Sequence, residues 1–105
     1  MAYNKAEMVR AVELLLTISP RSPLDDVARK LRVERHTISR SLRELKRTTF
    51  RGLQTQAVLT EAMILLRKPN LSVKEIASVL GYDSPRAFSS MFKKHLGKTP
   101  TQMRQ

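Results

Sequence analysis

One pattern of residues occurs twice in this chain, about fifty positions apart. Each copy has a short segment with apolar residues at helical spacing, then a tight turn, then a second helical segment. Val27 of the first copy corresponds to Ile76 of the second, an offset of 49, and beyond the turn Ile38 corresponds to Phe88, an offset of 50. A short helix, a tight turn and a second helix are the parts of a helix-turn-helix. The repeat therefore predicts two helix-turn-helix motifs in one polypeptide.

The spacing of apolar residues predicts helices and no strand, so the expected fold class is all-α. Ser22 followed by Pro23 predicts an N-cap with proline at the first helical position, and Ser72 with Glu75 has the spacing of a capping box. Gly81 suits a left-handed turn after a helix. The expected helical segments are residues 5–17, 23–31, 34–47, 52–68, 73–80, 84–96 and 100–104.

The segment 52–68 is apolar around more than one face. Its apolar residues are Leu53, Ala57, Leu59, Ala62, Met63, Leu65 and Leu66. A helix of this kind must be covered from more than one side, which suits a connector between two subdomains. At about 1.5 Å per residue it would span roughly 25 Å. We therefore expect a first helix-turn-helix subdomain over 1–50, a connecting helix over 51–68 and a second helix-turn-helix subdomain over 69–105.

The charge of the chain indicates its partners. Twenty Lys and Arg residues against 9 Asp and Glu residues give a formal net charge of +11. An excess of this size favours nucleic acid first and an anionic membrane surface second. The basic residues are spread over several expected helices and do not form one stripe, which disfavours the membrane. Double-stranded DNA is therefore the expected partner.

Several function classes are disfavoured by what the sequence lacks. It contains no cysteine, which excludes disulfides, thiolate metal sites and a cysteine nucleophile. No paired carboxylates or Ser-His-Asp set appear, so we expect no enzyme. His36 and His95 have no further ligands nearby in sequence, so neither a metal nor another cofactor is expected. No secretory signal is evident, which favours a cytoplasmic, nucleoid-associated protein.

The second helix of each motif divides into an apolar face and a polar face when its residues are placed at 3.6 per turn. The buried side is expected to carry Ile38, Leu42 and Leu45 in the first motif, and Phe88, Met91 and Phe92 in the second. The outward side carries His36, Arg40, Arg43 and Arg47, with Arg35 and Ser39 beside it, in the first motif. In the second motif it carries Arg86, Ser90 and Lys93, with Ser89 on the flank.

These outward residues suit a helix that lies in the major groove of DNA. Arginine can donate two hydrogen bonds to guanine O6 and N7, and serine can reach several base edges. A solvated helix face is the simpler explanation for one such helix. Both copies, however, place basic and small polar residues at matched positions, which favours DNA recognition.

A set of residues, mainly in the second half, resembles the signature of AraC/XylS-type transcription regulators. These residues are Ile76, Ala77, Leu80, Gly81, Tyr82, Phe88, Met91, Phe92, Lys93, Leu96, Gly97, Thr99, Pro100 and Arg104. The resemblance covers about residues 24–104 and implies a seven-helix unit, with two helix-turn-helix subdomains joined by a long helix and recognition helices in adjacent major-groove segments. It implies base-facing positions at Arg35, His36, Ser39 and Arg40, and at Arg86, Ala87, Ser89 and Ser90, with Lys93 near the DNA backbone.

The first half departs from the family pattern. Arg32 replaces the turn glycine, so a left-handed backbone there would be strained. Leu42 replaces the usual aromatic residue, Arg47 replaces the glycine after the helix, and the connecting helix reads Val58-Leu59 where Arg-Leu is typical. These changes leave the expected fold intact and make base reading by the first motif less strict.

The leading hypothesis is sequence-specific binding of double-stranded DNA in bacterial transcription regulation. Two recognition helices in one polypeptide would cover two major-groove segments about 34 Å apart, which predicts an asymmetric target. The alternative is a nonspecific nucleic-acid-binding or protein-interaction module. Glu44 and Glu61 are candidates for contact with RNA polymerase, although solvated helix faces explain them more simply. The operator, the choice between activation and repression, and whether the chain is complete stay open.

Overall fold

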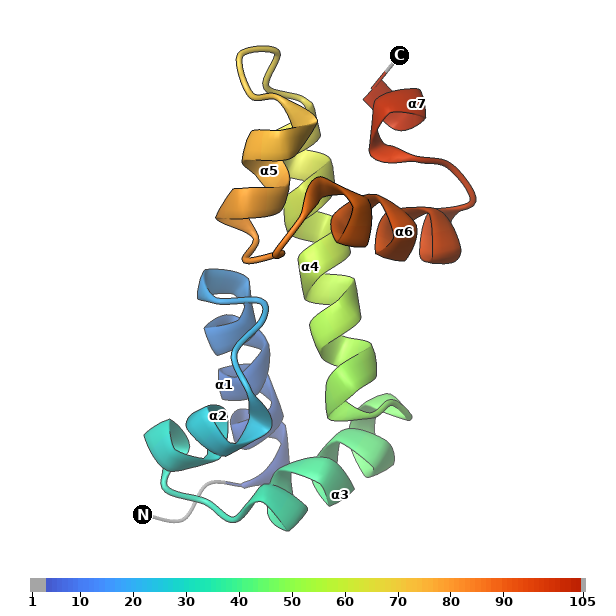
Figure 1. Ribbon diagram of the computed structural model, residues 1–105. Helices are drawn as coiled ribbons and strands as arrows, with labels where there is room; N and C mark the ends of the chain where they lie inside the picture. The colour runs from blue at the N-terminus through green and yellow to red at the C-terminus, as the bar shows by residue number, and fades with distance from the viewer. Residues whose placement is uncertain (1–3, 105) are drawn as a thin grey trace. The chain divides into compact units, whose positions relative to one another are not determined.

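The computed structural model describes residues 4–104, which form seven α-helices and no strand. The prediction of an all-α fold is confirmed. The helices are α1 (Lys5–Ile18), α2 (Leu24–Leu31), α3 (Arg35–Lys46), α4 (Phe50–Leu66), α5 (Val73–Val79), α6 (Pro85–Leu96) and α7 (Pro100–Arg104) (Figure 1). Contacts divide the chain into two compact units, residues 1–57 and residues 58–105. Helix α4 contributes its first turns to the first unit and its later turns to the second.

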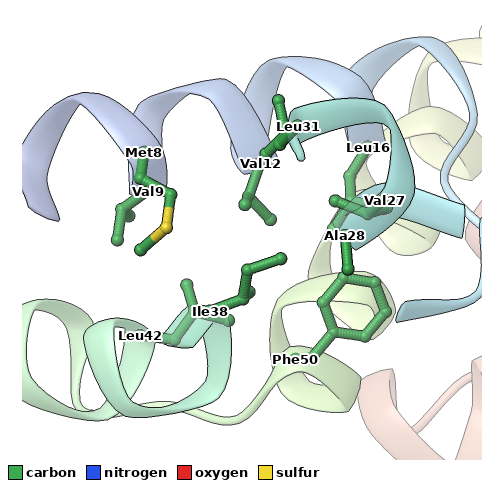
Figure 2. Packing of buried hydrophobic residues seen from close by; sticks show 10 residues of the cluster. All are labelled: Met8, Val9, Val12, Leu16, Val27, Ala28, Leu31, Ile38, Leu42 and Phe50. Carbon is green, nitrogen blue, oxygen red and sulfur yellow. The ribbon is translucent and has the colours of Figure 1, made fainter. Parts of the chain in front are cut away.

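The first unit is built around one apolar core. Side chains from α1, α2, α3 and the start of α4 converge on it (Figure 2). The residues that form this core are Met8, Val9, Val12, Leu16, Val27, Ala28, Leu31, Ile38, Leu42 and Phe50. Val12, Leu16, Ile38 and Leu42 have no exposed surface. Removing side chains of this size from water supplies the main stabilisation and fixes the face that α3 turns inward.

The second unit has a core of its own. It is formed by Val58, Leu59, Ala62, Leu65, Leu66, Ile76, Ala77, Leu80, Phe88 and Phe92. The Phe88 ring lies 5.5 Å from that of Tyr82 and 5.8 Å from that of Phe92, in tilted arrangements. Arg104 of α7 donates hydrogen bonds to the carbonyl oxygens of Leu66 and Lys68, at 3.1 and 3.2 Å. The first of these bonds satisfies the carbonyl of the last residue of α4, and the second adds to the bond that the Lys68 carbonyl accepts from the Leu71 N–H just after the helix.

Two helix starts illustrate how local sequence sets the boundaries. At α5 the Ser72 hydroxyl accepts from the Glu75 N–H and the Glu75 carboxylate accepts from the Ser72 N–H, both at 3.0 Å, so the predicted capping box is confirmed. At α2 the prediction was wrong, because Pro23 occupies the N-cap and no side chain caps the helix. The Pro23 carbonyl accepts from Asp26 and Val27, which places Ser22 one residue outside.

Two helix ends in the first unit have left-handed backbones at non-glycine residues. Arg32 follows α2 with φ 57°, and Arg47 follows α3 with φ 52°. At the equivalent positions of the second unit, Gly81 has φ 87° and Gly97 has φ 78°. The expected left-handed backbone at Arg32 is therefore present, and both motifs leave their helices through left-handed residues of different types.

Two residues expected on buried faces lie further out. Leu45 is 47% exposed, because it lies in the last turn of α3 and borders an open hollow with Ala6 and Val9 of α1. Met91 is half-buried at the edge of the second core. His95, expected to be packed or half-exposed, is exposed.

Candidate nucleic-acid interface

Helix α3 presents a polar, basic face opposite its buried face. Ile38, Ser41 and Leu42 are buried against the first core. On the other side His36, Arg40 and Arg43 are exposed and Ser39 is half-buried. These four residues line one shallow hollow of about 400 Å³. The structure thus brings together four of the five site residues predicted on this helix.

The fifth predicted residue, Arg35, is held in another way. Its guanidinium lies 3.1 Å from a carboxylate oxygen of Asp25, and both side chains are largely exposed. Asp25 belongs to the first turn of α2, so this ion pair joins the two helices of the motif. An exposed pair of this kind contributes little to stability and can be exchanged for a phosphate contact.

Helix α6 has the same division. Its N-cap Ser84 accepts a hydrogen bond from the Ala87 N–H at 3.1 Å, and Pro85 occupies the first helical position. Phe88 and Phe92 are completely buried. The predicted site residues on the opposite side are exposed, apart from the half-buried Ser89: they are Arg86, Ala87, Ser89, Ser90 and Lys93. Since the buried phenylalanines fix the rotation of the helix, this face is held toward solvent.

A second hollow lies at the C-terminal end of α3. It measures about 670 Å³ and is lined by Arg43, Glu44, Arg47, Thr48 and Thr49. Arg47 was predicted on the outward face, but neither it nor Thr48 or Thr49 was among the predicted site residues. The available signal was the spacing of Arg43 and Arg47, four residues apart and hence on one side of the helix. The two threonines gave no such signal, because they follow the helix.

The carboxylate of Glu44 is the one negative group lining that hollow. It accepts a hydrogen bond from the Lys5 ammonium at 2.6 Å. This hydrogen bond and the charge of Lys5 lower the pKa of Glu44, and the nearby charge of Arg40 lowers it further. Glu44 is therefore ionised and already paired with α1.

Neither a metal centre nor a membrane span is found in the part of the chain that the structure describes. Residues 4–104 contain no group of three or more side chains that could hold a metal ion. Within the same range, none of the helices combines the length and the apolar character needed to cross a bilayer.

Comparison with known proteins places the chain in a family. A family model described as a helix-turn-helix domain matches residues 27–105. The HTH-type transcriptional regulator GlxA of Rhizobium meliloti is 33% identical over 104 residues, which cover 97% of this chain and 32% of that protein. The C-terminal domain of AraT, a response regulator from Geobacillus stearothermophilus, has a TM-score of 0.85 at 30% identity, with 97% of this chain and 87% of that chain covered.

One structural neighbour was solved with DNA. It is the DNA-binding domain of AdpA, described as a global transcriptional factor in complex with a target DNA. The match has a TM-score of 0.76 at 25% identity and covers 98% of this chain and 91% of that one. This chain spans a third or less of the length of four of the curated relatives that it matches. From the family match and the two helix-turn-helix units, we conclude that the chain belongs to the helix-turn-helix family of AraC/XylS-type transcription regulators.

Proposed function

We propose that this chain binds double-stranded DNA at specific sequences and thereby regulates transcription. The observation that carries the proposal is the exposed face of α3, where His36, Ser39, Arg40 and Arg43 gather around one hollow while Ile38 and Leu42 on the opposite face are completely buried. A recognition helix needs this division, because one face must reach base edges while the other anchors the helix to the protein. The AdpA complex, a DNA-bound member of the same fold, supports the assignment.

Each site residue has a role that follows from its chemistry. Arg40 and Arg86 would each donate two hydrogen bonds to a guanine, and Ser39 and Ser90 would bond to adjacent base edges. His36 would donate to a base or a phosphate. Arg35, Arg43, Ala87, Ser89 and Lys93 would complete the contact surface, the charged residues toward phosphates and Ala87 toward the methyl group of thymine.

The two motifs act together in this proposal. Subdomains over 1–50 and 69–105, joined by a connecting helix over 51–68, would place two recognition helices in major-groove segments about 34 Å apart. One molecule would then recognise an asymmetric site without dimerising. The chain would work in the bacterial cytoplasm, at the nucleoid, without catalysing a reaction and without a cofactor. RNA polymerase is the proposed second partner, through partly buried Glu61, since Glu44 is paired with Lys5.

Selection of duplexes from a random pool on the purified chain tests the proposal. We expect an enriched, non-palindromic sequence with two conserved blocks about one helical turn apart. Arg40→Ala and Arg86→Ala should then each weaken binding to the selected duplex by about 1–3 kcal/mol and relax the preference at one block. Arg10→Ala, which removes an exposed arginine from α1, is the matched control and should leave the preference unchanged.

Three results would contradict the proposal. Failure to enrich any sequence would favour the alternative of a nonspecific nucleic-acid-binding or protein-interaction module. Equal losses on selected and random duplexes would show that Arg40 and Arg86 contact only the backbone. A palindromic product would indicate that two molecules bind together.

A further inference from the structure

The hollow at the C-terminal end of α3 has the composition of an anion site. We call it the Arg47 hollow, and its lining residues are Arg43, Glu44, Arg47, Thr48 and Thr49. Within residues 4–104, neither arginine forms an ion pair with a carboxylate. The one carboxylate in the lining, that of Glu44, is bound to Lys5. Two guanidinium groups without partners therefore adjoin one open space.

The threonine hydroxyls add to this donor set. Thr49 Oγ1 accepts the Gly52 N–H at 3.0 Å, so the hydroxyl hydrogen of Thr49 stays available to donate. The Thr48 hydroxyl donates to the Thr49 carbonyl at 3.4 Å, a long bond that is readily exchanged for a better acceptor. Guanidinium groups bind the oxygens of phosphate through paired hydrogen bonds, and hydroxyl groups complete such sites.

The backbone of Arg47 is the second observation. Arg47 lies in the left-handed region with φ 52° and ψ 39°, which strains any residue that has a Cβ. Fifty positions later, Gly97 ends α6 in the same region without that strain. Strained residues concentrate where the side chain has a function that outweighs the strain. At position 47 a glycine would make the better helix end, whereas the arginine adds a guanidinium group to the lining of the hollow.

We propose that the Arg47 hollow binds a phosphodiester group of the DNA backbone, with Arg47 and Arg43 pairing with the phosphate and Thr49 donating a further hydrogen bond. The inference rests on the proposed DNA binding and adds a site outside the base-facing residues. Arg43 lines both hollows of α3, so it joins the base-reading part to the phosphate site. Contacts of this kind fix the register of a recognition helix without reading sequence.

The test is the salt dependence of binding by Arg47→Gly. The probe is a labelled duplex of random sequence, about 30 bp or roughly three turns long, and then the selected duplex. We expect the slope of log affinity against log salt to decrease by about 0.9, and affinity at 0.1 M salt to fall about fivefold to tenfold on both duplexes. Arg47→Lys keeps the charge and should retain the slope. Because glycine relieves the backbone strain, Arg47→Gly should also melt at a higher temperature, which separates the effect from misfolding.

Arg32→Gly is the matched control. It removes the same charge from the same left-handed conformation, at a position that does not line the Arg47 hollow. An unchanged slope for Arg47→Gly, or an equal decrease for Arg32→Gly, would overturn the inference. Inorganic phosphate that raises the melting temperature of the wild type but not that of Arg47→Gly, together with an unchanged salt slope for Arg47→Gly, would identify a site for a free anion instead. If the chain enriched no sequence, the proposed sequence-specific function would be wrong. The salt slope of Arg47→Gly on the random duplex would still decide whether the Arg47 hollow binds phosphate.

Discussion

Arg32→Gly is expected to stabilise the first unit. Arg32 has φ 57° and ψ 42°, close to the ideal left-handed helix, where a residue with a Cβ costs about 1–2 kcal/mol relative to glycine. Glycine in turn costs about 0.5–1 kcal/mol more entropy on folding. The exposed Arg32 forms no ion pair with any residue in 4–104, so no contact of that kind is lost. The net gain is about 0.5–1 kcal/mol, or about 2–8 °C in the melting temperature of a domain of this size.

Thermal unfolding followed by circular dichroism measures this change. Removal of a positive charge from a chain of net charge +11 also relieves repulsion, so Arg32→Ala is needed as the control. Alanine removes the charge but keeps the Cβ, and its melting temperature should stay near that of the wild type. The converse substitution, Gly81→Ala, places a Cβ at φ 87° and should destabilise the second unit. If Arg32→Ala raised the melting temperature as much as Arg32→Gly, strain would not be the cause.

Two further predictions concern the second unit. Arg104→Ala removes the hydrogen bonds to the Leu66 and Lys68 carbonyls and should cost about 1–3 kcal/mol in urea unfolding, whereas a loss near zero would show that water replaces them. The capping hydrogen bonds from Ser72 lower the pKa of Glu75 below its ordinary value of 4.5. The ionised carboxylate therefore contributes its full stabilisation to the folded state above pH 4.5, and this stabilisation is lost as the pH falls through the lower pKa of the folded state. Glu75→Gln should melt with less dependence on acid pH, and an identical acid profile for both proteins would contradict this.

Much of the fold could be predicted because its signals are local. Apolar residues at helical spacing, together with capping, proline and glycine signals, predicted the seven helices that the structure shows in residues 4–104, and Ser72 with Glu75 marked a start that hydrogen bonds confirm. The prediction of an N-cap at Ser22 was wrong because a capping serine and a serine one residue earlier look alike in sequence. Only the bonds to the Pro23 carbonyl distinguish the two. Leu45 was misplaced because helical periodicity does not show that the space beside it and α1 stays an open hollow.

Part of the candidate site could likewise be predicted from the sequence, and part could not. The outward position of Arg40 and Arg43 follows from the burial of Ile38 and Leu42, which the sequence shows. The pairing of Arg35 with Asp25 could not be predicted from the sequence, because it depends on how α2 approaches α3. The spacing of Arg43 and Arg47 was visible in the sequence, but the place of Thr48 and Thr49 in the Arg47 hollow was not, since it depends on how the chain leaves α3 through a left-handed residue.

Both motifs have left-handed residues after their helices, but the residue types at these positions differ. The second motif ends its helices with Gly81 and Gly97, which adopt left-handed backbones at no steric cost. The first motif has Arg32 and Arg47 there, so it gives up stability at two turns and gains two exposed positive charges. Charge raises affinity for DNA of any sequence, whereas base contacts raise affinity for one sequence. We therefore expect Arg47 to add backbone affinity to the first unit, whereas Arg32, which does not line the Arg47 hollow, gives up the same stability without adding a phosphate contact there.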